Sequence, residues 1–392
     1  MLVVLRVKEI PPCLWGELFC ATNLRLAGTD YLTGTTLMFR SSLVILLLAV
    51  CIASQAQSLG GQNAFNFLRF PASPQQAALG GVNVSQLNND LSLAFHNPAR
   101  LNAAVHTHMV ANFNTLYSGI RNYHWMQAYR HPRIKTNFAA GIYFFDYGTI
   151  TETDAVGNVF GSIRPRDYVM QVAASREYLQ KWRYGVTLKY LASNYGIARS
   201  NAWAVDVGVL YTDSARFLQM SLVASNMGSQ LRRYSTNPEE LPFDLVLGIS
   251  KRLQKAPIQF SITAHHLHRF DILYNDTVFN NNLGGVIRNS SARGFTFDKL
   301  FQHFVFATQL FIGERVEVSV GYNYLRRSEL RIQNAANGLV GFSFGIGAIL
   351  PRLQLRYSRS YFQNTTAYNQ LGLNLPLNKY FGLGQWGEKH GW

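Results

Sequence analysis

The sequence of 392 residues predicts an all-β fold, a transmembrane antiparallel β-barrel of about 14 strands with an N-terminal plug segment. Three observations lead to this prediction. Apolar residues alternate with small or polar ones in long runs, these runs repeat along the chain, and short connections alternate with long ones. Together they are typical of strands that cross a bilayer and close into a barrel.

The clearest run extends from Asn201 to Thr212, where every second residue is large and apolar. A period of two places these side chains on one face of an extended strand. Aromatic residues stand at both ends of this face, and such rings prefer the headgroup level of a membrane. The expected lipid-interface aromatics of this and similar runs are Trp203, Tyr211, Trp182, Tyr190, Tyr322 and Tyr324. One such strand would also fit a soluble β-sandwich. The repetition of the pattern along the chain and the composition of the other face decide between a sandwich and a membrane barrel.

The composition favours a membrane barrel. Hydrophobic residues make up 48% of the chain, aromatic residues 13% and charged residues only 15%, which suits strands with one face toward lipid. The net charge of +15 is scattered along the chain, which argues against a nucleic-acid partner and suits anionic lipid or lipopolysaccharide. The three cysteines, Cys13, Cys20 and Cys51, all lie near the N-terminus. If a leader is removed, the mature chain has neither a disulfide framework nor a Cys-ligated metal site.

We expect residues 1–56 to be absent from the mature protein. Residues 1–37 match no targeting pattern, and we interpret them as a wrongly assigned upstream extension before a true start at Met38. Residues 38–56 predict a signal peptide, with Arg40, an apolar stretch and a small-x-small cleavage site that ends at Ala56. A lipoprotein signal at Cys51 is the less favoured alternative, because the preceding Val50 is bulky for such a site.

Residues 57–104 do not alternate. Pro, Gly and Asn separate short apolar pieces, which predicts compact irregular structure with a helical turn or two. The many apolar residues of this range argue that it packs against something. We therefore expect it to be the plug, followed by a barrel over 105–376 and a periplasmic tail over 377–392.

The barrel range divides into about fourteen alternating segments of roughly 11–14 residues, longer than ordinary strands. They are 105–118, 120–131, 134–147, 166–178, 182–194, 201–212, 216–226, 241–253, 257–268, 300–312, 315–326, 338–350, 352–362 and 365–376. Tight turns alternate with longer loops, the longest being 148–165 and 269–299. This pattern predicts location in the outer membrane of a Gram-negative bacterium, with both termini in the periplasm.

Few residues suggest chemistry. His265, His266 and His268 fall within one predicted strand, and His266 and His268 would share a face. No carboxylate or third ligand is evident nearby, so we expect no metal. No catalytic constellation or cofactor motif stands out either, and we expect no enzyme. Charged residues on the small-residue face would line the lumen, as a filling network or, less favoured, as a solute path: Asp206, Asp244, Glu317, Arg183, Lys189 and Arg356.

Several motifs resemble a known family. Ala77 to Gly81, Asp90 to Phe95 and Asn97-Pro98-Ala99 are similar to the N-terminal plug signature of the outer-membrane fatty-acid transporter (FadL) superfamily. The plug-motif residues are Leu79, Gly80, Gly81, Asp90, Asn97, Pro98 and Ala99. Further pieces resemble the PorQ-like proteins of the Bacteroidetes type IX secretion system: Gly60 to Leu68, Ser225 to Gln230, Leu241-Pro242-Phe243 and Thr263 to Leu267. The resemblance implies a fourteen-stranded barrel and no catalytic residue.

Three functions follow as hypotheses. The first, implied by the resemblance, is a non-enzymatic outer-membrane component of type IX protein secretion. It would anchor surface-exposed subunits that process and attach cargo, through loops 148–165 and 269–299. The alternative is a transporter of hydrophobic small molecules, with residues 57–104 as a movable plug. A surface hydrolase is the least favoured, because no Ser/His/Asp group can be located.

Overall fold

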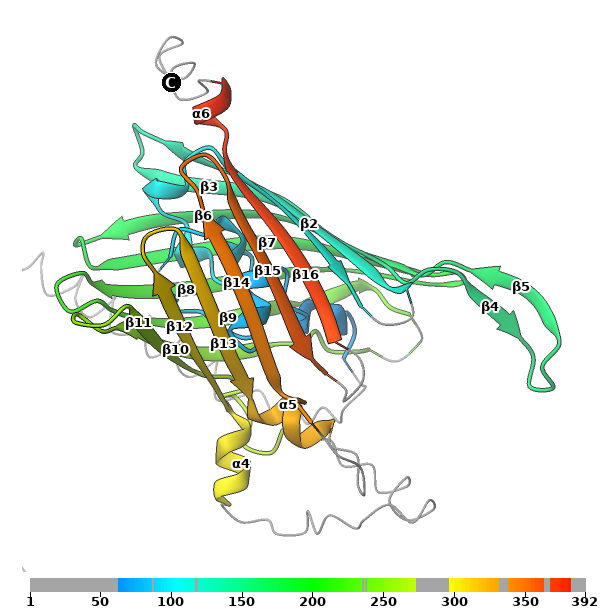
Figure 1. Cartoon of the computed structure of the whole chain (residues 1–392). Coiled ribbons are helices and arrows are strands. Elements are labelled where there is room, and N and C mark those ends of the chain that lie inside the picture. Colours follow the sequence, from blue (N-terminus) through cyan, green and yellow to red (C-terminus); the bar gives the residue numbers. More distant parts are fainter. Residues whose placement is uncertain are drawn as a thin grey trace, which may run out of the picture. The chain divides into compact units, whose positions relative to one another are not determined.

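The computed structural model describes residues 63–381, except 87, 117–118, 235, 237, 273–295, 331–337 and 363–366. Fourteen antiparallel strands form a closed barrel in which β1 pairs with both β2 and β16 (Figure 1). They are β1 His108–Thr115, β2 Arg121–His131, β3 Thr136–Asp146, β6 Arg166–Tyr178, β7 Trp182–Tyr195, β8 Ala198–Asp213, β9 Leu218–Arg232, β10 Asp244–Arg252, β11 Ile258–Ala264, β12 Phe304–Ile312, β13 Val316–Asn323, β14 Phe342–Ile349, β15 Gln354–Tyr361 and β16 Ala367–Pro376. Each predicted range overlaps one of them, so the predicted barrel of about 14 antiparallel strands is confirmed.

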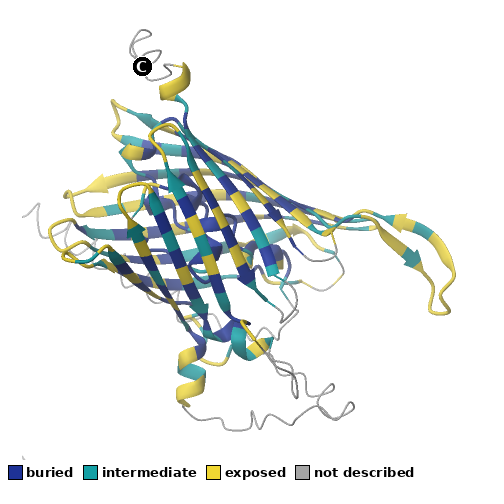
Figure 2. Ribbon diagram, in the orientation of Figure 1, coloured by how far each residue is buried: buried dark blue, intermediate teal, exposed yellow. Residues whose placement is uncertain are grey.

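The wall has an apolar exterior and a polar interior. On β7 the exposed side chains are Trp182, Tyr184, Val186 and Leu188, while the alternate residues Thr187 and Lys189 are buried. The same alternation of exposed and buried positions recurs on the neighbouring strands (Figure 2). A water-soluble protein would bury its large apolar side chains instead. Lipid therefore covers the outside of this barrel.

A charge placed on this outer face gives a direct test. Val186 lies between the aromatic ends of β7, so Val186→Arg should reduce the free energy of unfolding in lipid by about 2–4 kcal/mol, the cost of an arginine at the bilayer midplane. Val159→Arg is the matched control, because Val159 is exposed on the hairpin outside the barrel. Urea unfolding in liposomes measures both changes, and equal losses would contradict a lipid-facing Val186.

The long loop between β3 and β6 forms a hairpin of its own, β4 Ile150–Thr153 and β5 Val159–Ile163. It extends away from the barrel in Figure 1. Ile150, Val156, Val159 and Phe160 are all exposed, with fractions from 48% to 87%. Apolar side chains outside both the core and the lipid-facing wall are available to a partner.

Several strand boundaries differ from the sequence predictions. β11 ends at Ala264, so the three histidines follow the strand instead of lying in it, and His266 has a left-handed φ of 56°. β13 ends at Asn323, whose side chain accepts the Arg326 N–H and caps helix α5 (Tyr324–Glu329). Tyr324 is therefore helical and does not end a strand. A two-residue turn, and not a longer loop, joins β7 to β8, and β9 continues to Arg232.

Short helices complete the described structure. η1 Asn66–Arg69, α2 Pro74–Ala78, η2 Leu91–Phe95, η3 Pro98–Arg100 and η4 Ala103–Val105 precede the barrel, and α4 Phe297–Gln302, α5 and α6 Asn378–Phe381 flank its strands. Within the described residues, none of these helices reaches the length and apolarity of a membrane-spanning helix. The predicted extension and signal peptide, most of loop 269–299 and the end of the tail lie outside the described residues.

Candidate functional site

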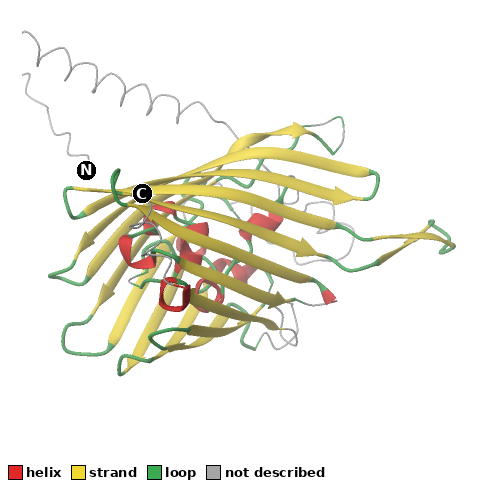
Figure 3. Ribbon diagram, turned by 90° about the horizontal axis from the view of Figure 1, so that it is seen from above, coloured by secondary structure: helices red, strands yellow, loops and turns green. Residues whose placement is uncertain are grey.

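Residues 63–107, named here the lumen segment, run along the inner wall of the barrel. Figure 3, viewed from above, shows its short helices enclosed by the strands. At its start, Asn63 forms a bridge with Glu240 in the loop after β9, at the end of the barrel that carries the long loops. At its finish, the Thr107 carbonyl accepts the Leu377 N–H beside the short turns. The segment therefore passes from one end of the lumen to the other.

Between these ends the lumen segment follows the inner wall about once around the barrel. Its contacts follow the strand order: Pro74 against β16, Ala77 on β15, Gly80 on β13, Asn83 on β11, Ser85 on β10, Asn97 against β8, Pro98 against β7 and Leu101 on β6. Most of these are hydrogen bonds between a wall side chain and the segment's backbone or short polar side chains. The polar inner face predicted from the alternation is therefore paired to this segment.

Wall glycines permit the close approach of the segment. A Cβ on Gly185 would lie 2.5 Å from the Pro98 carbonyl carbon, and one on Gly208 would collide with the Asn97 amide. A Cβ on Gly321 would collide with the Gly80 nitrogen. The small residues on the inner face of these strands thus make room for the lumen segment.

The plug-motif residues predicted from the sequence lie in these contacts. Leu79 ends helix α2 and is buried, and Gly80 and Gly81 follow it with φ of 88° and 91°. The Gly80 carbonyl accepts hydrogen bonds from Asn323 (3.1 Å) and Arg326 (3.1 Å). Glycine is required at this turn because other residues rarely adopt such φ values.

The second half of the plug motif builds capped turns. Asp90 accepts the Ser92 N–H at 2.9 Å, and Asn97 accepts the Ala99 N–H at 3.0 Å, so each caps a short helix. The Asn97 amide also donates to the Ser221 hydroxyl of β9 at 2.8 Å. Pro98 and Ala99, both buried, then pack against β7. Capping therefore orders the segment and leaves side-chain donors for the wall.

Asp90 also belongs to a buried charged cluster near the short turns. Arg356 of β15 places Nε 2.5 Å from Glu317 Oε1 of β13, and its Nη1 lies 3.4 Å from Asp90 Oδ2. Gln309 donates to the other Glu317 oxygen at 3.0 Å. One guanidinium thus joins the lumen segment to two strands of the wall.

A second buried pair lies where the β8–β9 pairing is irregular. The register shifts between Val205 and Val207, and the Asn226 N–H donates to Asp206 Oδ1 at 2.7 Å. Lys189 Nζ lies 2.5 Å from Asp206 Oδ2 and 4.9 Å from the centre of the Phe95 ring. Since these charges and those around Arg356 are buried and paired, they favour the filling network over a solute path.

The end of the lumen near the long loops is aromatic. The aromatic cluster consists of Phe65, Phe67, Phe70, Phe95, Tyr143, Phe145, Tyr147, Tyr195, Tyr234, Phe362 and Tyr368. Phe67 meets Phe145 edge to face at 5.4 Å, and Phe70 lies 6.0 Å from both Phe145 and Tyr368. Rings of the lumen segment and of the wall therefore form one apolar surface.

The lumen therefore has two zones. Near the short turns the described interior residues are mainly polar, including Gln86, Gln259, Gln309, Glu317, Arg356 and Asn374. Near the long loops the aromatic cluster replaces them, and Asp167 at its edge accepts the Tyr147 and Tyr195 hydroxyls at 2.6 and 2.9 Å. Sequence reasoning noted the apolar content of the lumen segment but could not assign its partners on the wall.

The predicted interface aromatics occupy outward positions on β7 and β8. Trp182 pairs with Tyr211 near the short turns, and Tyr190 pairs with Trp203 toward the long loops, with ring centres 5.0 and 5.2 Å apart. Tyr322 packs 4.8 Å from Phe342 on the neighbouring strand. Their role at the lipid interface remains a prediction.

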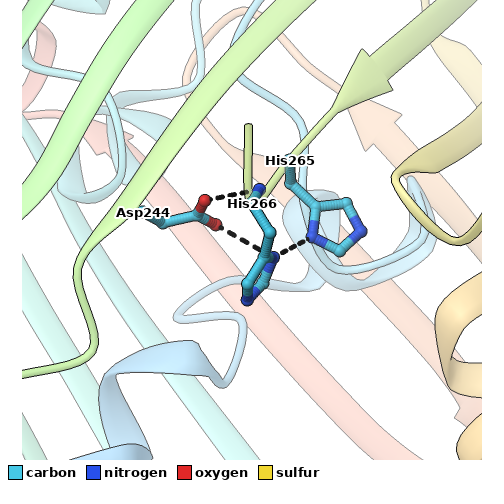
Figure 4. Close-up of side chains that lie close together, drawn as sticks. All are labelled: Asp244, His265 and His266. Carbon is cyan, nitrogen blue, oxygen red and sulfur yellow. Dashed lines mark hydrogen bonds and ion pairs between the residues drawn. The ribbon is translucent and has the colours of Figure 1, made fainter. Parts of the chain in front are cut away.

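The histidines end up in a different arrangement from the predicted one. Asp244, the first residue of β10, supplies the carboxylate that the sequence did not reveal (Figure 4). His265 and His266 face each other beside it, and His268 stacks on His266 with ring centres 6.1 Å apart. The antiparallel pairing of β10 with β11 brings these residues together.

No protein-family model and no curated protein matches this sequence. Among solved structures, the barrel is similar to a mutant of the TodX monoaromatic hydrocarbon channel, with 12% identity, a TM-score of 0.45 and coverage of 78% of this chain and 98% of that chain. It is also similar to the CymD monoaromatic hydrocarbon channel (14%, 0.41, 80% and 97%) and to the KdgM porin (4%, 0.30, 68% and 98%). These values describe a distant likeness.

The structure itself establishes the location. An even number of antiparallel strands closes the barrel, and the outer face is apolar. The start of β1 and the end of β16 both lie beside the short turns. These are the features of bacterial outer-membrane barrels. The protein is an outer-membrane β-barrel of a Gram-negative bacterium.

Proposed function

We propose that the barrel binds hydrophobic small molecules at its long-loop end and passes them across the outer membrane, with the lumen segment as the gate. The aromatic cluster is the observation that carries this proposal. Phe67 and Phe70 of the segment pack against the wall rings Phe145 and Tyr368, and Phe65 packs against Tyr234 in the loop after β9. An aromatic solute offers the same kind of contact, so it can compete with these rings for the wall.

The two zones of the lumen support a gated route. A hydrophobic solute gains from leaving water for the aromatic zone, at about 25 cal/mol per Å² of apolar surface buried. The zone near the short turns is closed to it by paired polar groups. Passage therefore requires the lumen segment to move, and the segment's capped turns allow it to move as a few ordered pieces.

A reversible crosslink tests the gate. The Ser85 and Ser250 hydroxyls lie 2.8 Å apart, one on the segment and one on β10. Ser85→Cys with Ser250→Cys should form a disulfide in a chain whose only natural cysteines are Cys13, Cys20 and Cys51. Uptake of toluene by cells carrying this variant should fall to the level of a deletion strain when oxidised and recover after reduction.

The single-cysteine variants are the controls and should transport in both redox states. Transport that continues through the oxidised double variant would show that the segment is not the gate. Uptake that does not depend on the barrel in any variant would contradict the transport function itself. Phe67→Ala, which opens space beside Phe145, should increase uptake, whereas the lipid-facing Phe113→Ala should not.

A second candidate function is anchoring of surface-exposed subunits of type IX secretion, and the β4–β5 hairpin favours it. Val156, Val159 and Phe160 are 87%, 67% and 69% exposed on an element outside the barrel. Such a surface suits a protein partner. Loop 269–299, the other predicted docking loop, lies mostly outside the described residues.

Polar substitutions on the exposed face of the hairpin test this candidate. Val159→Thr with Phe160→Ser should reduce the surface attachment of secreted cargo and the recovery of partner proteins in mild detergent. Glu152→Gln in the same hairpin is the control and should leave both unchanged. Normal cargo attachment in the double variant, with the barrel present at wild-type level, would remove the hairpin from this role.

A further inference from the structure

Asp244, His265 and His266 form a compact donor set at the long-loop end of the barrel. The candidate ligand atoms of the three residues all lie within 4.8 Å of one another (Figure 4). Asp244 begins β10, and the two histidines directly follow β11, which pairs with β10. The closed sheet therefore fixes the carboxylate and the imidazoles on adjacent strand ends.

The backbone N–H and the ring of His266 both face the carboxylate. The His266 N–H donates to Asp244 Oδ1 at 2.6 Å, and His266 Nδ1 lies 3.6 Å from Asp244 Oδ2. His266 has a φ of 56°, which costs free energy for a residue with a side chain and is found preferentially at functional sites. This conformation turns the His266 ring back toward His265.

The contact between the rings brings two candidate ligand atoms together. His265 Nδ1 and His266 Nδ1 face each other in direct contact. A neutral imidazole carries its proton on either nitrogen, so one ring can donate its Nδ1–H to the other, or both Nδ1 lone pairs can bind one metal ion. His265 Nε2 is buried without a hydrogen-bond partner, so no second contact fixes the proton position of this ring.

Neighbouring residues position the set. The His265 N–H donates to the His303 carbonyl at 2.9 Å, and His303 Nδ1 lies 2.8 Å from the His265 carbonyl oxygen. His303 is thereby occupied and acts as a positioning residue. Arg69 and Arg269 add positive charge near the rings, and Asp244 supplies the opposing negative charge.

We propose that Asp244, His265 and His266 bind a divalent transition-metal ion of the zinc class. Two imidazoles and one carboxylate suit Zn²⁺, Ni²⁺, Co²⁺ or Cu²⁺, whereas Ca²⁺ and Mg²⁺ prefer oxygen ligands alone. Zn–N distances of about 2.0–2.1 Å would move the two rings slightly apart. Three protein ligands leave a fourth position for water or for a further ligand.

Metal binding to the purified protein tests the proposal. The full chain, carrying no polyhistidine tag and stripped with EDTA in detergent, should bind about one Zn²⁺ by calorimetry, and Co²⁺ should give the visible absorption of a nitrogen-ligated site. His266→Gln and Asp244→Asn should each weaken binding more than about tenfold, since even second-shell losses cost 10–100-fold. His131→Ala, which removes a histidine at the opposite end of the barrel, should leave it unchanged.

Asp244→Asn keeps an acceptor for the His266 N–H, so it separates ligation from folding, and heat-dependent mobility on gels confirms that each variant is a closed barrel. Wild-type protein that binds no Zn²⁺ would overturn the proposal. So would binding that survives in a correctly folded His265→Ala, His266→Gln double variant. His268→Ala shows whether the stacked ring supplies the fourth ligand.

Discussion

Replacement of Arg356 by methionine is expected to reduce the free energy of unfolding by about 3–5 kcal/mol, the usual cost of breaking a buried ion pair on one side. The guanidinium is the cation that contacts both Glu317 and Asp90 among the described residues. Its loss leaves two carboxylates buried without a counterion. The lumen segment should then also detach locally from β15, because Asp90 belongs to the segment. Urea unfolding in detergent measures the loss, and protease cleavage within the segment measures the detachment.

Two comparisons make this result specific. Arg359, three residues later on β15, is exposed on the outer face, so Arg359→Met should change the stability little. Adding Asp90→Asn and Glu317→Gln to Arg356→Met removes the unpaired charges and should restore part of the lost stability. If Arg356→Met unfolds at the wild-type urea concentration, the cluster does not hold the segment to the wall.

Substitution of Gly80 by alanine is expected to cost about 2–5 kcal/mol. Its φ of 88° strains any other residue by about 1–2 kcal/mol. The added Cβ would also collide with the Val305 side chain, and such overpacking costs about 1–3 kcal/mol more. Asn323 and Arg326 both donate hydrogen bonds to the Gly80 carbonyl in this turn. A distorted turn should therefore weaken the contact between the lumen segment and β13.

Gly148→Ala separates the two causes. Gly148 has a φ of 75°, and a Cβ added there meets open space, so only the backbone strain remains. Its loss should be about 1–2 kcal/mol. Urea unfolding of both variants gives the difference, and equal losses would show that the contact with Val305 contributes nothing.

The lumen segment shows where sequence reasoning reached its limit. The Gly, Pro and Asn residues of 57–104 predicted irregular structure with helical turns, and the structure has capped turns at Asp90 and Asn97. Those signals are local, since a cap and its N–H lie two or three residues apart. The path around the wall depends on contacts such as Asn83 with Ser261, which no local pattern encodes.

The loop with His265, His266 and His268 shows the same limit, because here the local pattern predicted a strand that is too long. The alternation suggested that β11 continues to residue 268, and it therefore paired His266 with His268. The strand stops at Ala264, and Asp244 arrives from the neighbouring strand. Whether a strand ends depends on its partners, because β10 itself pairs with β11 only as far as Ala264.

The sequence alone determined the number of strands and the face that each turns to lipid, because a period of two assigns every side chain to one side of the sheet without reference to any other segment. The tertiary structure decided which residues fill the barrel lumen and which residues come together at its long-loop end. Arg356 and Asp90 become neighbours only when the lumen segment packs inside the closed barrel, and Asp244 meets His265 and His266 only when β10 pairs with β11. These contacts join residues that are distant in the chain, and the gate and the metal site are proposed where such contacts form.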